Sequence, residues 1–99
     1  VFDPMTERFS PGPGMLEPRY KLPGGVVALP GSRALVAGGG SSAEIVDVPG
    51  WSSEQIARYD EQASFATVNL LEADDALILG GYNSQIQLTG LARTIRSTW

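Results

Sequence analysis

The side chains that most often carry catalysis are missing from this sequence or poorly supported in it. The 99 residues contain no Cys and no His, which excludes thiolate nucleophiles, disulfides and imidazole bases or ligands. Ser52 and Ser53 therefore have no neighbour of the type that activates a hydroxyl. Glu54, Asp60 and Glu61 are of the type used in pairs for glycoside hydrolysis, but exposed charges on a loop or helix explain them better.

Two further polar segments also have a simpler structural explanation. Glu72, Asp74 and Asp75 are a possible cation or acid/base site, yet they lie where a hairpin turn is expected. The segment Gly38-Gly39-Gly40-Ser41-Ser42 resembles a phosphate-binding loop, but such a loop needs Gly-Lys-Ser/Thr at the start of a helix. No Lys follows here. We therefore expect no catalytic residue, no metal site and no cofactor.

Composition narrows the class of protein. Apolar residues make up 42% and charged residues 18% of the chain, which is typical of a globular domain. The net charge is −4, and the seven basic residues are scattered, which argues against a nucleic-acid partner. No apolar run reaches the length of a membrane-spanning helix. The sequence does not indicate a compartment.

The apolar runs are short and bounded by Gly, Pro and Asp, a pattern that favours β-strands. Strands are predicted at 26–29, 33–37, 43–48, 64–71 and 76–79, with weaker patterns at 85–88 and 91–97. Turns are predicted at Pro30-Gly31-Ser32 and Ala73-Asp74-Asp75. The stretch 52–59 begins with an N-cap signal, so a short helix and an edge strand both remain open there.

The chain repeats itself at an offset of 42 residues. Val26-Val27-Ala28-Leu29 aligns with Val68-Asn69-Leu70-Leu71, and the segment 34–39 aligns with 76–81, each ending in Gly-Gly. Phe9 aligns with Trp51 at the same offset, and the next aromatic counterpart is Trp99, 48 residues later. A period of this size indicates a solenoid or a propeller.

These units resemble the kelch repeat in its bacterial style. The resemblance covers essentially the whole chain and rests on Gly pairs at strand ends, on Asp at turns and on aromatics after them: Gly38, Gly39, Gly80, Gly81, Asp3, Asp47, Phe9, Trp51 and Trp99. The string Phe2-Asp3-Pro4…Phe9…Met15…Arg19 belongs to the same pattern. The second unit departs from it, because Thr89 or Arg93 stands where the Asp belongs. WD40 repeats have a closer period, but their Trp-Asp and Gly-His pairs are absent.

The resemblance implies an all-β fold with about two four-stranded antiparallel blades of a kelch-type β-propeller. Residues 1–99 would form a single partial propeller domain: 1–18 as tail strands of a preceding blade, 19–60 as one kelch repeat and 61–99 as a second, degenerate at its end. The aromatics would fill the gaps between blades. Since a propeller needs 4–8 blades, we expect either a part of a longer propeller or a short chain that assembles, for example as a homotrimer.

Two residues are candidates for ligand binding on this basis. Arg19 would precede an inner strand and either meet a polar ligand in the central channel or tie neighbouring segments together by hydrogen bonds. Tyr82 follows Gly80-Gly81 and would lie at the rim of one face, where it would contact a ligand or simply pack.

The expected function is that of a scaffold or binding module, because propellers carry their function in loops rather than in the fold. The partner would be another protein or neighbouring blades. The alternative is the propeller portion of a larger carbohydrate-active or oxidase enzyme. An oxidase of this type needs Cys and His ligands around copper, so its catalytic residues would lie outside this chain.

Overall fold

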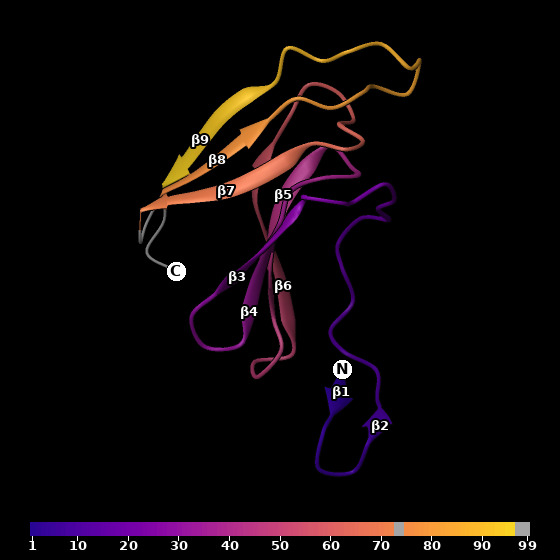
Figure 1. Cartoon of the computed structure of the whole chain (residues 1–99), viewed down its shortest axis with the longest axis vertical. Coiled ribbons are helices and arrows are strands. Elements are labelled where there is room, and N and C mark those ends of the chain that lie inside the picture. Colours follow the sequence, from indigo (N-terminus) through magenta and orange to yellow (C-terminus); the bar gives the residue numbers. More distant parts are fainter. Residues whose placement is uncertain (73–74, 97–99) are drawn as a thin grey trace.

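The computed structural model describes residues 1–72 and 75–96, which form three antiparallel sheets and contain no helix (Figure 1). The strands of the two-stranded sheet are β1 (Phe2–Asp3) and β2 (Arg8–Phe9). The four-stranded sheet contains β3 (Val26–Leu29), β4 (Arg33–Val36), β5 (Ser42–Asp47) and β6 (Ser52–Arg58). The three-stranded sheet contains β7 (Thr67–Glu72), β8 (Asp75–Leu79) and β9 (Ala92–Arg96).

The all-β expectation is confirmed, and the strand patterns are mostly confirmed as well. Residues 52–58 form a strand rather than a helix. The second large sheet has three strands, not four, within the described part of the chain. The strand predicted at 85–88 is wrong: the side-chain oxygen of Asn83 accepts the amides of Gln85 and Gln87, and such local bonds compete with sheet pairing. Ala73, Asp74 and Trp99 lie outside the described residues.

Aspartates form the turns at the two equivalent hairpins. The Asp3 carboxylate accepts the amide of Met5, and the Asp47 carboxylate accepts the amide of Gly50, both at 2.9 Å. Such side-chain bonds are the reason that Asp favours turns. The register also matches, since Asp3 lies opposite Arg8 in β1–β2 and Asp47 lies opposite Ser52 in β5–β6. The two hairpins are thus related by an offset of 44 residues.

Phe9 and Trp51 do not correspond to each other in the two hairpins. At an offset of 44, Trp51 corresponds to Glu7, and both have left-handed backbone angles (φ 53° and 55°). Phe9 instead corresponds to Ser53. Trp51 is 59% and Phe9 is 82% exposed, so among the described residues neither fills a gap between sheets, and the Phe9 ring meets the Phe2 ring at a tilt of 44° with centroids 5.0 Å apart. The alignment of Phe9 with Trp51 is therefore wrong.

The two larger sheets repeat the same ladder. Val26 pairs with Val36 in the first, and Val68 pairs with Ile78 in the second, at the predicted offset of 42. The third strand is displaced by a longer connection, 80–91 instead of 37–41. Register nevertheless gives the counterpart of each residue: Glu44 lies opposite Val36, and Arg93 lies opposite Ile78. Arg93 thus stands where the first sheet has Glu44.

The two larger sheets pack face to face in a head-to-tail manner. The face that the first sheet uses for this contact corresponds to the outer face of the second sheet, and the reverse also holds. The shared core contains buried apolar residues from one face of each large sheet and from the connection between them: Leu29, Leu35, Ala37, Ala43, Ile45, Ala63, Ala66, Val68, Ala76, Ile78 and Ile95. Strands β3 and β7 lie side by side, and the amide of Val68 donates to Gly24 O at 2.8 Å. The first sheet contributes Leu35 and Ala37 to this core, whereas their counterparts in the second sheet are Leu77 and Leu79.

Leu77 and Leu79 belong to the opposite face of the second sheet, which we call the open face: Asn69, Leu77, Leu79, Ala92 and Thr94. These residues alternate along their strands with the buried Val68, Ala76, Ile78 and Ile95, and side chains alternate between the two faces of a sheet. Leu79 is 40% exposed. The face that is covered in the first sheet is therefore uncovered in the second.

Candidate functional site

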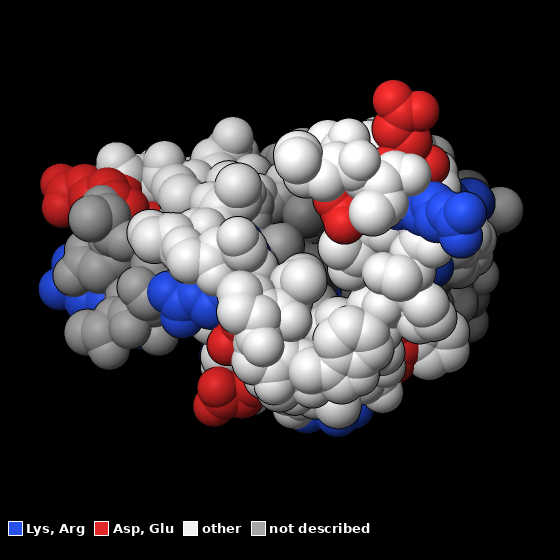
Figure 2. Space-filling model, turned by 90° about the horizontal axis from the view of Figure 1, so that it is seen from below, with Lys and Arg blue, Asp and Glu red and all other residues white. Residues whose placement is uncertain are grey.

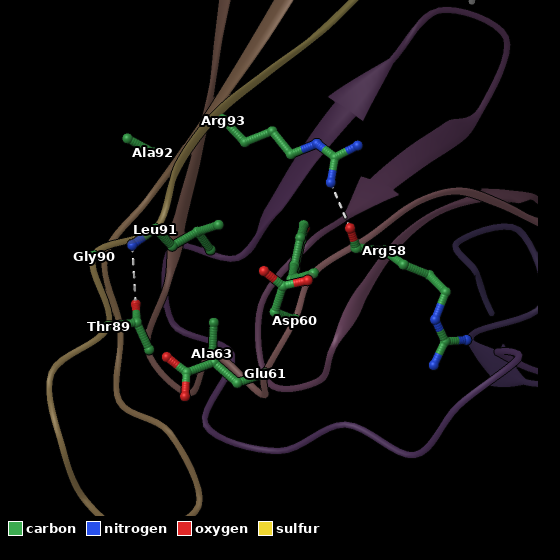
Figure 3. Close-up of a pocket in the computed structure, with 10 residues that line it drawn as sticks. Arg58, Asp60, Glu61, Ala63, Thr89, Gly90, Leu91, Ala92 and Arg93 are labelled. Atoms are coloured by element: carbon green, nitrogen blue, oxygen red, sulfur yellow. Dashed lines mark hydrogen bonds between the residues drawn. The ribbon is translucent and has the colours of Figure 1, made fainter.

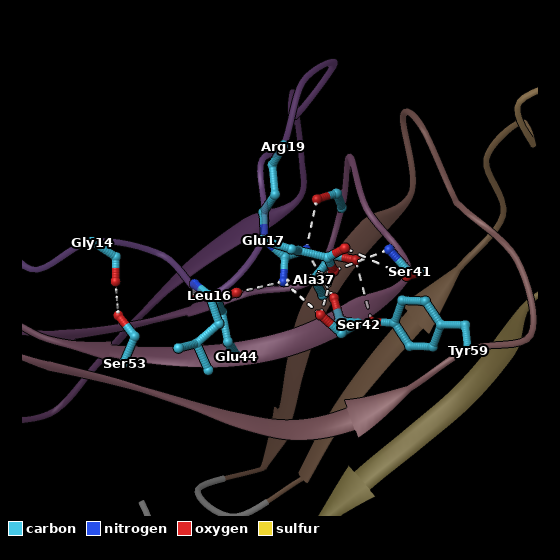
Figure 4. A network of polar contacts seen from close by, with 11 residues as sticks. Gly14, Leu16, Glu17, Arg19, Ala37, Ser41, Ser42, Glu44, Ser53 and Tyr59 are labelled. Atoms are coloured by element: carbon cyan, nitrogen blue, oxygen red, sulfur yellow. Dashed lines mark hydrogen bonds and ion pairs between the residues drawn. The ribbon is translucent and has the colours of Figure 1, made fainter.

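Arg19 is buried against the start of β5, where it holds together a network of polar groups (Figure 4). Its Nη1 donates to Gly38 O at 3.1 Å and to Ser42 O at 2.8 Å. Its Nη2 donates to Ser42 Oγ at 3.0 Å and to Glu44 Oε2 at 2.9 Å. The Arg19 and Glu44 side chains are both 0% exposed, so the charge of each is compensated by the other rather than by water.

Glu17 is the second carboxylate of the network and lies nearer to solvent. It is 3.4 Å from Arg19 Nη2, and it accepts hydrogen bonds from the Ser41 amide at 3.1 Å and from the Ser42 hydroxyl. Desolvation by burial raises the pKa of Glu17. The hydrogen bond from Ser42, the charge of Arg19 and the bonds from Ser41 outweigh it and hold that pKa below its usual value. Glu17 is therefore ionised at neutral pH.

The network pins the segment 14–19 onto the first sheet. The Leu16 amide donates to Glu44 Oε1 at 3.0 Å, and the Ser53 hydroxyl donates to Gly14 O at 2.7 Å. Of the two roles considered for Arg19, these contacts match the structural one, in which it ties neighbouring segments together. A cavity of about 330 Å³ lies beside the network, lined by Glu17, Pro18, Arg19, Tyr20, Gly39, Gly40, Ser41 and Gln62.

Tyr59 lies between the first network and the second large sheet. Its hydroxyl donates to Ala37 O at 3.2 Å. Burial raises the pKa of Tyr59 to about 12, although the positive charges of Arg19 and Arg93 act in the opposite direction. The phenol is consequently neutral at physiological pH, and it acts as a hydrogen-bond donor and packing group.

Tyr82, the other predicted ligand contact, belongs to a different cluster. It is partly exposed, and its ring meets Phe65 edge to face with centroids 6.4 Å apart. The Lys21 ammonium lies 5.8 Å from the Phe65 ring centre and 5.2 Å from that of Tyr20. Backbone bonds of 2.8 Å in both directions join Tyr82 to Ser64. Arg19 and Tyr82 thus do not form one site.

A second cavity, of about 350 Å³, was not anticipated (Figure 3). It lies between the end of β6 and the start of β9, and its lining comes from these two segments: Arg58, Tyr59, Asp60, Glu61, Ala63, Thr89, Gly90, Leu91, Ala92 and Arg93. The Arg93 guanidinium donates to Arg58 O. The one sequence signal for this site was the place of Arg93, where the repeat pattern expects Asp.

The charges on the face shown in Figure 2 are mixed in sign. In Figure 2 the Lys and Arg side chains are separate from one another and interspersed with Asp and Glu. Residues 1–72 and 75–96 contain no group of three or more side chains arranged to hold a metal ion. The same residues include no helical segment with the length and hydropathy needed to cross a bilayer.

Comparison with protein-family models, with curated proteins and with solved structures gives no match for this chain.

Proposed function

We propose that this chain forms two successive units of a kelch-type β-propeller that serves as a scaffold for binding another protein and has no catalytic activity of its own. The single observation that carries the proposal is the head-to-tail stacking of the two large sheets. One face of the first sheet is covered by the opposite face of the second, and an interface of this kind can be repeated until a ring closes.

The open face of the second sheet is the surface on which the next unit of such a ring would pack. Leu77 and Leu79 are the counterparts of Leu35 and Ala37, which the second sheet buries completely. A further unit of the same kind would bury the open face in the same way. At about 25 cal/mol per Å² of apolar surface, that burial would favour association.

The β1–β2 hairpin, which precedes the first large sheet in the chain, also supports the proposal. It has the register and the Asp-centred turn of the β5–β6 hairpin, and it hangs away from the two larger sheets in Figure 1. Such a hairpin is what the outer strands of a preceding unit would look like, as the resemblance to the kelch repeat implies.

Binding of a partner protein is assigned to the long connection 80–91. Asn83 organises it through its bonds to the amides of Gln85 and Gln87 and through a bond to Glu61. The loop presents Ile86 and Leu88, which are 81% and 77% exposed. An ordered loop that displays apolar side chains has the character of a recognition loop.

Light scattering of the isolated chain at increasing concentration tests the stacking proposal. We expect self-association, because a second copy can supply the missing neighbour, and we expect a homotrimer if the ring closes at six units. Leu79→Glu places a charge on the open face and should return the chain to one copy. Leu88→Glu makes the same change on the loop and is the matched control, with association unchanged. A folded wild-type monomer at high concentration would contradict the proposal.

A further inference from the structure

The second cavity occupies the place that Arg19 fills in the first unit. A Cβ on Gly39 would lie 2.3 Å from Tyr20 O, and a Cβ on Gly81 would lie 2.8 Å from Ser64 O. Tyr20 and Ser64 are therefore equivalent, at an offset of 44. The residues that precede them, Arg19 and Ala63, are then counterparts as well.

The residues that follow confirm this match. Lys21 and Phe65 both have left-handed backbone angles, with φ of 57° and 62°. Ala63 is buried, so the second unit has a methyl group where the first has a guanidinium. The space left by the shorter side chain opens into the cavity, which Ala63 lines.

The second unit satisfies the surrounding carbonyls without an arginine. In the first unit Arg19 donates to Gly38 O. In the second, the Thr89 hydroxyl donates to the counterpart carbonyl, Gly80 O, at 2.8 Å. The Gly80 amide donates to Leu91 O at 2.9 Å. Because these acceptors have partners, the cavity needs no internal cation to complete it.

The charge at the position of Glu44 is reversed in the second unit, where the exposed Arg93 takes its place. The first unit places Glu44 opposite Arg19, whereas the second places Arg93 at the Glu44 position. Within the described residues no carboxylate lies within 4.0 Å of Arg93, and its bond to Arg58 O uses one of five guanidinium donors. A cation with free donors thus faces the cavity from β9.

The opposite wall carries two carboxylates and one guanidinium, that of Arg58. Asp60 and Glu61 line the cavity from the connection after β6. Glu61 is engaged by the Asn83 amide at 3.1 Å, but Asp60 accepts no hydrogen bond from the described part of the chain. In Figure 3 the Asp60 carboxylate and the Arg93 guanidinium come from opposite sides of the site. Asp60 and Arg93 are thus opposite charges in the lining of one cavity, and within the described residues they are not paired with each other.

We propose that this cavity binds a small amino-carboxylate, whose carboxylate pairs with Arg93 and whose ammonium pairs with Asp60. A volume of about 350 Å³ is at the lower end for ligand sites, which suits a free amino acid. The guanidinium recognises the planar carboxylate by paired hydrogen bonds. The inference does not depend on the propeller, because it uses only contacts within this chain.

Titration of the ¹⁵N-labelled chain with glycine, β-alanine and 4-aminobutyrate, followed by NMR, tests the proposal. The three probes differ in the spacing of their charges. We expect saturable shifts at Gly90, Leu91, Ala92 and the Arg93 side chain with at least one of them, and weaker shifts with acetate or ethylamine. Arg93→Gln and Asp60→Asn should each weaken binding about tenfold or more, since a lost charge pair costs at least 1.4 kcal/mol.

Arg8→Gln makes the same charge change on β2 and is the matched control, with binding unchanged. The double variant Ala63→Arg/Arg93→Glu rebuilds the pair of the first unit inside the second. It should remain folded, as judged by its dispersed spectrum, and it should not bind. The absence of saturable shifts in the wild-type chain would overturn the proposal, as would shifts that persist in Arg93→Gln. Self-association is a separate readout, so failure here leaves the stacking proposal intact.

Discussion

At the scale of single residues, the Arg19–Glu44 pair shows how a buried charge is tolerated. Each partner would cost several kcal/mol to desolvate alone. The pair is tolerated because backbone carbonyls and the Ser42 hydroxyl bind the other hydrogens of Nη1 and Nη2, and the Leu16 amide binds the carboxylate. The buried Nε of Arg19 has no hydrogen-bond partner among the described residues. The interaction therefore depends on both partners being present.

Removal of one partner should be far more damaging than removal of both. Arg19→Met leaves Glu44 buried without its counter-charge, and we expect a loss of about 3–5 kcal/mol in the free energy of unfolding. Arg19→Met/Glu44→Leu should recover a large part of that loss, because no charge remains buried. Urea unfolding of the two variants measures the difference. A double variant as unstable as the single one would show that the pair is not the reason for the loss.

At the scale of elements, the strands were largely predictable and the loops were not. Short apolar runs bounded by Gly or Pro marked β3, β4 and β8 correctly, because hydrophobic alternation and turn residues act locally. The strand predicted at 85–88 does not form, because the Asn83 side chain accepts hydrogen bonds from the amides of Gln85 and Gln87. Both a ligand-binding and a structural role were open for Arg19 from the sequence, and its hydrogen bonds match the structural one. The Arg93 cavity was not predictable, because it depends on a register that an insertion at 80–91 displaces.

Glycine is needed for different physical reasons at the two Gly-Gly strand ends. Gly39 (φ 73°) faces Tyr20 O, which a Cβ would approach to 2.3 Å, whereas Gly80 (φ 75°) has no atom within 4 Å of that position. Gly80→Ala should therefore cost about 1–2 kcal/mol for the backbone conformation alone. Gly39→Ala should cost clearly more, because the clash is with backbone. Thermal unfolding of the two variants compares them, and equal losses would contradict this account.

At the scale of the whole molecule, the two units have the same strand pairing, but the acidic and basic residues of one cross-strand pair are exchanged between them. Arg33 lies opposite Asp47 in the first sheet, and Asp75 lies opposite Arg96 in the second. Arg96 binds the Asp75 carboxylate through Nε and Nη2, at 2.7 and 2.9 Å. Opposite charges directly across a ladder stabilise pairing, and like charges weaken it.

This exchange can be undone in one unit. Asp75→Arg/Arg96→Asp gives the second sheet the charge order of the first. The Arg96 side chain is 74% exposed and that of Asp75 is 18% exposed, so the pair is near the surface and we expect the stability to change by less than about 1 kcal/mol. Refolding from urea should nevertheless return less native protein than in the wild type, measured as the recovered fraction of dispersed NMR signal. Equal recovery would show that the charge order has no part in folding.

The exchanged pairs affect how two similar units in one chain find their own strand partners during folding. Strand exchange between units is a common failure of repeat proteins. If β9 docked on β4 in the equivalent register, Arg96 would meet Arg33; if β5 docked on β8, Asp47 would meet Asp75. Both wrong pairings bring like charges together, whereas both correct ones bring opposite charges together. The charge order thus labels each strand with the unit to which it belongs.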